Sequence, residues 1–289
     1  MQPTLMFDHC YQKVTRLSDY ERFESLGFTL LAGSAEHPYS LFSRILFFGS
    51  PEVSVNGAIH CLEFCWIRDV EGELAYAKES NPTAQERDLF SPGFSLRSST
   101  SLEATFEMQK TRWAPFRPTL SHRNYDWTDG GEGRRAGWNF LNFETPLVPG
   151  VEVWATEYEA SPAREGKRLE RLAMPPHRNG VNAILGFVFD VSEQGKAALS
   201  LVTGAQWHEG VLGLQDGPKI FNQRERPEFA GLFQTKTSPF KAVILGCASL
   251  TRFSQVSRLL PLEQRAMVQI AAPQPESWDI LVAEPSLVG

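Results

Sequence analysis

The sequence has no apolar run approaching the roughly 20 residues that cross a bilayer. Only four residues precede the first strand-like run, so we expect no signal peptide and a cytoplasmic location. Lysine and arginine are scattered without a long basic block and the net charge is -6, so we expect neither nucleic acid nor a membrane as a partner. Four cysteines are too few for the disulfide framework of a small secreted domain, and we expect them to be reduced.

Several short catalytic motifs are also missing. The chain has no Gly-x-Ser-x-Gly elbow, no His-Glu-x-x-His pair and no Cys-x-x-Cys pair, which argues against the common hydrolases, zinc proteases and zinc ribbons. The glycine-rich stretch over residues 129–135 lacks the Gly-Lys-Ser/Thr ending of a phosphate loop, and we expect a hairpin loop there.

What the chain contains is an ordinary globular composition rich in aromatic residues. Of its 289 residues, 42% are hydrophobic, 21% are charged and 11% are aromatic. Such a composition is typical of a folded protein with a large core. The length suits about two domains.

The first 66 residues predict the order strand, helix, strand, strand, strand. The first strand contains Asp8 and His9, the helix starts at a capping box that begins with Ser18, and Gly27 ends it. The predicted helix covers residues 18–26, and the later strands cover residues 28–33, 41–49 and 58–66. Alternation in the last strand puts Cys61, Glu63 and Cys65 on one face, which suggests a lined cavity.

The same order recurs along the chain, and we divide it into four βαβββ units. A strand over residues 182–191 leads to a helix that Ser192 caps, and a further strand begins at residue 241. The second unit contains a predicted helix over residues 101–113, entered by a capping box of Thr100 and Glu103. Its strands are predicted over residues 119–127, 137–144 and 151–158, and the four units lie near residues 5–70, 90–160, 180–237 and 239–287.

We therefore predict an α+β fold of tandem βαβββ modules that form curled, mostly antiparallel sheets around an open cavity. Domain boundaries are placed at residues 1–160 and 175–289, and the second domain is expected to be degenerate. Ala183 and Ala242 align there with His9, so the later units lack that histidine. Two polar stretches, residues 71–88 and 161–171, are interpreted as solvated linkers.

These residues resemble the vicinal oxygen chelate superfamily, which includes glyoxalases, bleomycin resistance proteins and extradiol dioxygenases, and within it the glyoxalase-like domain proteins. The resemblance rests mainly on Phe7-Asp8-His9, on Leu26-Gly27-Phe28 and on Cys61-Leu62-Glu63-Phe64. It implies a divalent metal held by one residue from the first strand and one from the last strand of each of two modules. His9 and Glu63 match the first pair. In the second module, Glu152 matches only loosely and Ser95 is the nearest polar residue on the first strand.

The resemblance implies a metal site at His9, Glu63 and Glu152, with zinc, manganese, nickel or iron as the metal. An imidazole with carboxylates suits all four metals, and positions left to water or substrate allow Lewis-acid chemistry. Tyr11 and Lys13 share the His9 face by alternation and, with Glu63, are candidates for catalysis through polarising a substrate oxygen or moving a proton. The alternative is that His9 is a hydrogen-bonded strand residue and Glu63 a cavity carboxylate, with no metal bound.

Two functions remain open from the sequence. One is a metal-dependent lyase, isomerase or dioxygenase of the vicinal oxygen chelate type that acts on a small oxygenated substrate. The other is a metal-free protein that binds or sequesters a small molecule in the same cavity. The modules pair either within the chain or across a homodimer.

Overall fold

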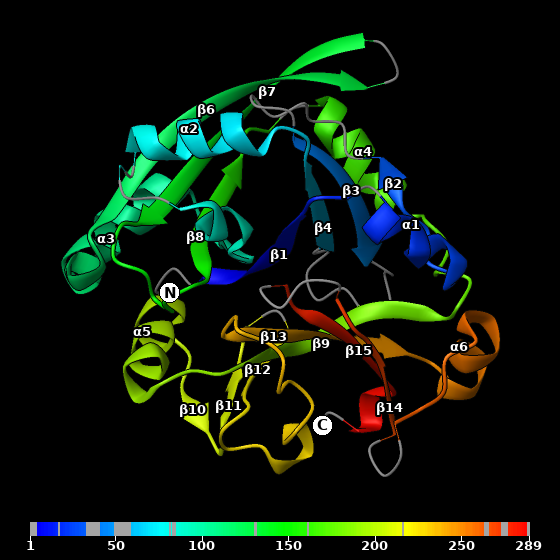
Figure 1. The fold of residues 1–289 in the computed structure, drawn as a ribbon. Helices are drawn as coiled ribbons and strands as arrows, with labels where there is room; N and C mark the ends of the chain where they lie inside the picture. Colours follow the sequence, from blue (N-terminus) through cyan, green and yellow to red (C-terminus); the bar gives the residue numbers. More distant parts are fainter. Residues whose placement is uncertain are drawn as a thin grey trace.

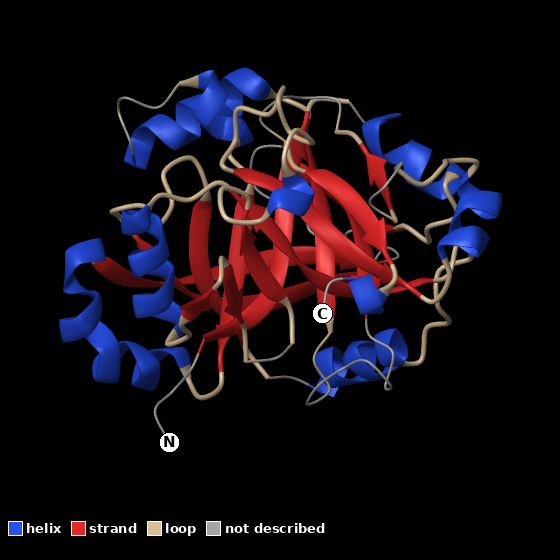
Figure 2. Ribbon diagram, turned by 90° about the horizontal axis from the view of Figure 1, so that it is seen from below, coloured by secondary structure: helices blue, strands red, loops and turns tan. Residues whose placement is uncertain are grey.

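The structure is a computed structural model that describes all residues except 1–4, 17, 33–40, 49–58, 81, 83–84, 130–131, 161, 216, 263–265, 273–276 and 288–289. Two sheets make up its centre, and Figure 1 shows the first sheet above the second. Figure 2 shows the helices around the rim of these sheets. None of the helices in the described ranges is long and apolar enough to cross a membrane.

The first sheet has eight strands in the order β2-β3-β4-β1-β5-β8-β7-β6. Their bounds are β1 Leu5–Val14, β2 Leu31–Ala32, β3 Leu41–Phe48, β4 His60–Ile67, β5 Gly93–Ser98, β6 Pro118–Asp129, β7 Glu132–Phe143 and β8 Glu152–Tyr158. β1 runs parallel to β4, and β5 runs parallel to β8, whereas β1 and β5 are antiparallel neighbours. Two βαβββ modules therefore pair within the chain, at the middle of one sheet.

The second sheet has seven strands in the order β10-β11-β12-β9-β13-β15-β14. Their bounds are β9 Val181–Phe189, β10 Trp207–His208, β11 Val211–Gly213, β12 Lys219–Asn222, β13 Phe240–Cys247, β14 Met267–Ile270 and β15 Asp279–Ala283. The pairing repeats that of the first sheet, because β9 and β13 are antiparallel neighbours at its middle. The fourth module has two strands after its helix in the part of the chain that is described.

Each module has one helix near its start, and serine caps begin three of them. The helices are α1 Ser18–Ser25, α3 Leu102–Trp113, α5 Glu193–Thr203 and α6 Leu250–Ser257. The Ser192 hydroxyl accepts from the Gly195 N–H at the start of α5, as predicted. At α3 the predicted cap is one residue early, because the Ser101 hydroxyl, and not Thr100, accepts from the Ala104 N–H.

The two stretches interpreted as solvated linkers form helices instead. They contain α2 Val70–Ser80 and α4 Pro162–Leu172, and the 3-10 turn η2 Glu86–Phe90 follows α2. Their alanine, glutamate, lysine and leucine residues are strong helix formers, so high polarity here did not mean the absence of structure. Leu74 of α2 packs on Ile67 and Leu89, which gives this helix an apolar anchor. Other short turns are η3 Ala114–Phe116, η4 Pro227–Phe229 and η5 Pro285–Leu287.

Aromatic side chains fill the space between the sheets. The Phe7 ring of β1 lies 4.5 Å from that of Phe187 of β9, and Phe94 of β5 also contacts Phe187, at 4.9 Å. Phe64 of β4 and Trp278 beside β15 meet at 5.7 Å. We call the sheet faces that meet here the inner faces. The opposite faces are the outer faces.

The outer face of the second sheet is covered by apolar side chains. Phe229 and Phe233 pack on it, in one cluster with Val188 and Ile244. Ala242 belongs to the same buried cluster. The outer face of the first sheet instead carries polar side chains, among them His9, Tyr11 and Lys13.

Candidate functional site on the outer face of the first sheet

A β-bulge near the start of β1 sets up this face. Phe7 pairs with Leu96 and His9 pairs with Ser95, so Asp8 is an extra residue in the pairing of β1 with β5. At such a bulge the side chains no longer alternate strictly, and neighbouring residues can share one face. Asp8 and His9 both face outward here, and their side chains are in contact.

His9 is held by a carboxylate. Its Nδ1 lies 2.6 Å from Asp8 Oδ2, and the Tyr158 hydroxyl donates to the same carboxylate oxygen at 2.7 Å. Burial acts to lower the pKa of His9, but the hydrogen bond and charge of Asp8, helped by the charge of Glu63, raise it above its ordinary value of 6.5. The pKa of Asp8 is lowered, because the contacts with His9 and Tyr158 outweigh burial. The pair therefore favours an imidazolium beside a carboxylate, and among the described residues no hydrogen bond to His9 Nε2 is found.

Tyr11 reaches across β5 to β8. Its hydroxyl donates to Glu152 Oε2, and burial together with the Glu152 charge raises the Tyr11 pKa well above 10. This reach depends on Gly93, because a Cβ at that position would overlap the Tyr11 ring. Lys13 lies 3.9 Å from Glu152 Oε1 and 5.6 Å from the centre of the Tyr11 ring.

Trp154 of β8 contacts both His9 and Tyr11. Its ring lies 5.5 Å from the His9 ring and 5.2 Å from the Tyr11 ring. Its indole N–H donates to the Thr156 hydroxyl at 2.8 Å, and that hydroxyl is 3.1 Å from the buried Ser95 hydroxyl. The orientation of the ring is thus fixed, and the face presents cationic side chains beside an aromatic wall.

β4 adds Cys61 and Glu63 to the face. Cys61 is paired with His9 across the parallel strands, and Glu63 is paired with Tyr11. Burial raises the pKa of Cys61 and Cys65 well above 9, which disfavours the thiolate form of both side chains.

The donor set does not fit a three-ligand metal centre. Glu63, Tyr11, Gly93 and Glu152 occupy consecutive strands in one row, with the Tyr11 ring lying over Gly93. Glu152 is engaged by Tyr11 and Lys13. In the described ranges, no three His, Cys, Asp or Glu side chains gather closely enough to hold a metal ion. Catalytic zinc sites use three protein ligands, and the described residues of this face do not bring three such side chains together.

Two helices that the sequence did not predict border the face. Glu73 of α2 is 7% exposed, and burial raises its pKa although the nearby Lys13 charge opposes the change. Arg171 of α4 lies 4.2 Å over the ring of Phe47, the residue paired with Cys61. Asp8, Trp154 and Tyr158 were not predicted as site residues either; alternation from Glu152 along β8 indicates Trp154 and Tyr158.

Solved structures of similar fold include dioxygenases. A catechol 2,3-dioxygenase has a TM-score of 0.50 at 9% sequence identity, over 97% of this chain and 88% of that one. A homoprotocatechuate 2,3-dioxygenase from Arthrobacter globiformis has a TM-score of 0.49 at 11% identity, over 96% and 80%. An extradiol ring-cleaving dioxygenase from B. fuscum has a TM-score of 0.49 at 12% identity, over 96% and 71%.

No protein-family profile and no curated protein matches the sequence. The likeness to the catechol 2,3-dioxygenase structure confirms the predicted α+β fold, and at this identity it shows the fold alone.

Proposed function

We propose that the outer face of the first sheet binds a small, planar, oxygenated anion without a metal. The observation that carries this proposal is the His9–Asp8 pair, in which the carboxylate raises the His9 pKa and so favours a positively charged imidazole beside the ring of Trp154. The His9 side chain is only 12% exposed and that of Lys13 only 13%. An anion bound to them would be shielded from water, and its ionic contacts would therefore be stronger than on an exposed surface.

The roles of the side chains follow from their partners. His9 Nε2 donates to a ligand oxygen, Lys13 supplies a second positive charge, and the Trp154 ring packs against the plane of the ligand. Tyr11 stays protonated, because its pKa is raised, and orients Glu152 instead of acting as a base. Affinity for an anion is therefore highest while His9 is charged, and it falls as the pH rises through the His9 pKa.

The test uses 4-nitrocatechol, a planar oxygenated compound that absorbs visible light and ionises near neutral pH. Protein treated with a chelator and shown to be metal-free by elemental analysis is titrated with it. We expect saturable binding that weakens about tenfold in His9→Asn and in Lys13→Gln protein. Lys78→Gln, which removes an exposed lysine from α2, serves as the charge-matched control. Wild-type and His9→Asn proteins of equal affinity would contradict the proposal.

A second candidate is a divalent-metal-dependent enzyme of the dioxygenase, lyase or isomerase type. A carboxylate that holds one imidazole nitrogen is the usual arrangement behind a metal-bound histidine, and Asp8 has this relation to His9. This reading requires stoichiometric metal in protein purified without chelator, with iron, manganese, zinc or nickel identified by elemental analysis. It also requires loss of that metal in His9→Ala and in Glu63→Gln protein. Unchanged metal content in both variants rules it out.

A further inference from the structure

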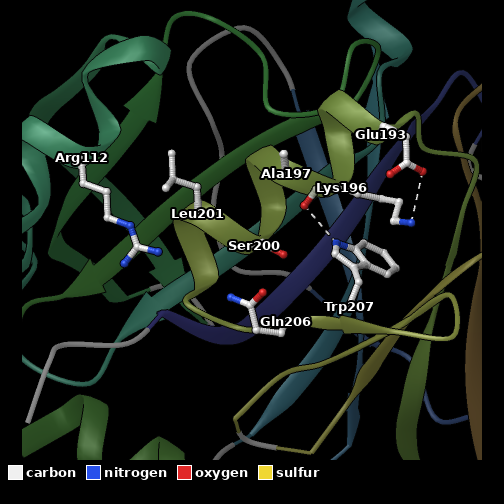
Figure 3. Close-up of a pocket in the computed structure, with 8 residues that line it drawn as sticks. All are labelled: Arg112, Glu193, Lys196, Ala197, Ser200, Leu201, Gln206 and Trp207. Carbon is white, nitrogen blue, oxygen red and sulfur yellow. Dashed lines mark hydrogen bonds and ion pairs between the residues drawn. The ribbon is translucent and has the colours of Figure 1, made fainter.

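A pocket of about 490 Å³ opens between α3 and α5, and no residue of the outer-face site lines it. Its walls come from the end of α3, from one side of α5 and from the start of β10 (Figure 3). The volume lies within the range of about 300 to 1,000 Å³ that small-molecule pockets occupy.

The pocket lies at the seam between the two halves of the molecule. α3 belongs to a module of the first sheet and α5 to a module of the second. The buried Trp113 of α3 donates its indole N–H to the Leu201 carbonyl of α5 at 3.3 Å, so the two walls are fixed to one another. A ligand here would contact both halves.

One end of the pocket carries a free positive charge. Arg112 is exposed in the last turn of α3, and no hydrogen bond or ion pair is found for its guanidinium within the described residues. Lys196, the other cation, is already engaged by Glu193 at 3.2 Å and by Glu225 at 2.8 Å. Arg112 is therefore the group that would attract an anion, and a guanidinium matches a carboxylate in geometry.

The other end is formed by the Trp207 ring, and Lys196 Nζ lies 5.8 Å from the centre of that ring. The Trp207 indole N–H donates to the Lys196 carbonyl at 2.9 Å, which satisfies its one polar group and fixes the ring. Figure 3 shows Arg112 and Trp207 at opposite ends, with Leu201 and Ser200 between them and Gln206 below. An apolar ring and a free cation separated in this way fit a ligand with an aromatic body and one acidic group.

We propose that this pocket binds a small aromatic monocarboxylate. Its carboxylate pairs with Arg112, its ring packs on Trp207 and Leu201, and Ser200 and Gln206 offer hydrogen bonds to polar substituents. The site is separate from the outer face, so the chain holds two different small-molecule sites.

The test measures binding of 1-naphthoate by calorimetry to wild-type protein and to Arg112→Gln protein. We expect saturable binding to wild type and an affinity about tenfold lower or worse in Arg112→Gln. The neutral isostere 1-naphthamide should bind the wild type as weakly as naphthoate binds the variant. Lys110→Gln removes the same charge from the same helix outside the pocket and should leave the affinity unchanged.

A further control separates this site from the outer face. In Lys13→Gln protein, where anion binding to the outer face is weakened, saturable binding of 1-naphthoate should persist, because Lys13 does not line the pocket, and adding Arg112→Gln to that protein should remove it. Equal affinity of wild-type and Arg112→Gln proteins overturns the proposal, as does the lack of saturable binding by folded wild-type protein. A loss of affinity in Lys13→Gln but not in Arg112→Gln places the ligand on the outer face and overturns it too.

Discussion

The contact between Asp8 and His9 is the residue-scale feature with the clearest electrostatic consequence. Asp8→Asn removes the negative charge from the group that hydrogen-bonds to His9, while the imidazole stays buried. We expect the pKa of His9 to fall below its wild-type value, and NMR titration of the ring protons measures it. Asp19→Asn on α1 is the control, and a His9 pKa that does not differ between Asp8→Asn and wild type would contradict this assignment.

A second residue-scale prediction concerns Gly93. An alanine there would push the Tyr11 ring off β5 and break its contact with Glu152. We expect the Tyr11 pKa to drop toward 10, as followed by the ultraviolet absorbance of tyrosinate with Tyr11→Phe protein as the reference. Gly213→Ala, where a Cβ meets open space, should leave the titration unchanged. Identical tyrosinate titrations in wild type and Gly93→Ala would show that the ring does not depend on Gly93.

His177 gives a third prediction, on pH and stability. Burial lowers its pKa from 6.5 to about 4, and its Nδ1 accepts from the Thr29 N–H at 3.0 Å. The unfolded chain binds a proton on this ring below about pH 6.5, whereas the folded protein does so only near pH 4. The contribution of His177 to the free energy of unfolding is therefore fully present above pH 6.5. It is lost as the pH falls toward 4, and the total loss is about 3 kcal/mol.

Urea unfolding between pH 7 and pH 4.5 measures this effect. An asparagine at position 177 keeps an acceptor for Thr29 but does not titrate, so His177→Asn should show the smaller loss of stability with falling pH. Parallel pH dependences for wild type and variant would mean that His177 does not contribute.

At the scale of elements, the Ser192 cap is a local feature that the sequence predicted. Ser192 accepts from Gly195 at the start of α5, whereas the cap of α6, where Ser249 accepts from Arg252, was not predicted. Replacing Ser192 by alanine should lower the free energy of unfolding by about 1 kcal/mol, as measured by urea denaturation. Ser192→Asp retains a capping oxygen and should stay near wild-type stability. If the alanine variant is as stable as the aspartate variant, the cap does not stabilise α5.

The sequence predicted the strand order of the modules, because alternation and glycine or serine boundaries are local signals. It missed α2 and α4, because a polar helix differs little in composition from a solvated loop. It placed His9, Tyr11 and Lys13 on one face but could not reveal Asp8 beside His9, since the bulge is set by the partner strand. The spacing of residues along the chain also does not predict that the Tyr11 ring lies over Gly93.

At the scale of the whole molecule, the shared aromatic core joins the two sheets. Phe187 of β9 contacts both Phe7 and Phe94 of the first sheet. Phe187→Ala should cost about 3 to 5 kcal/mol and reduce amide protection in both sheets, as measured by hydrogen exchange. Tyr76→Ala on α2, a half-buried aromatic residue outside this core, is the control and should affect the region of α2 alone. Loss of protection confined to the second sheet would show that the halves unfold independently.

The bulge at Asp8 also affects how this protein could change over evolutionary time. In a regular strand, consecutive side chains point to opposite faces, so a His-Asp dyad of neighbours could not form. Loss of the single codon for Asp8 would leave Phe7 inward and His9 outward in an unbroken alternation. The fold and its core would be preserved while the dyad vanished, so one small deletion separates a relative with a charged imidazole on this face from a relative without one.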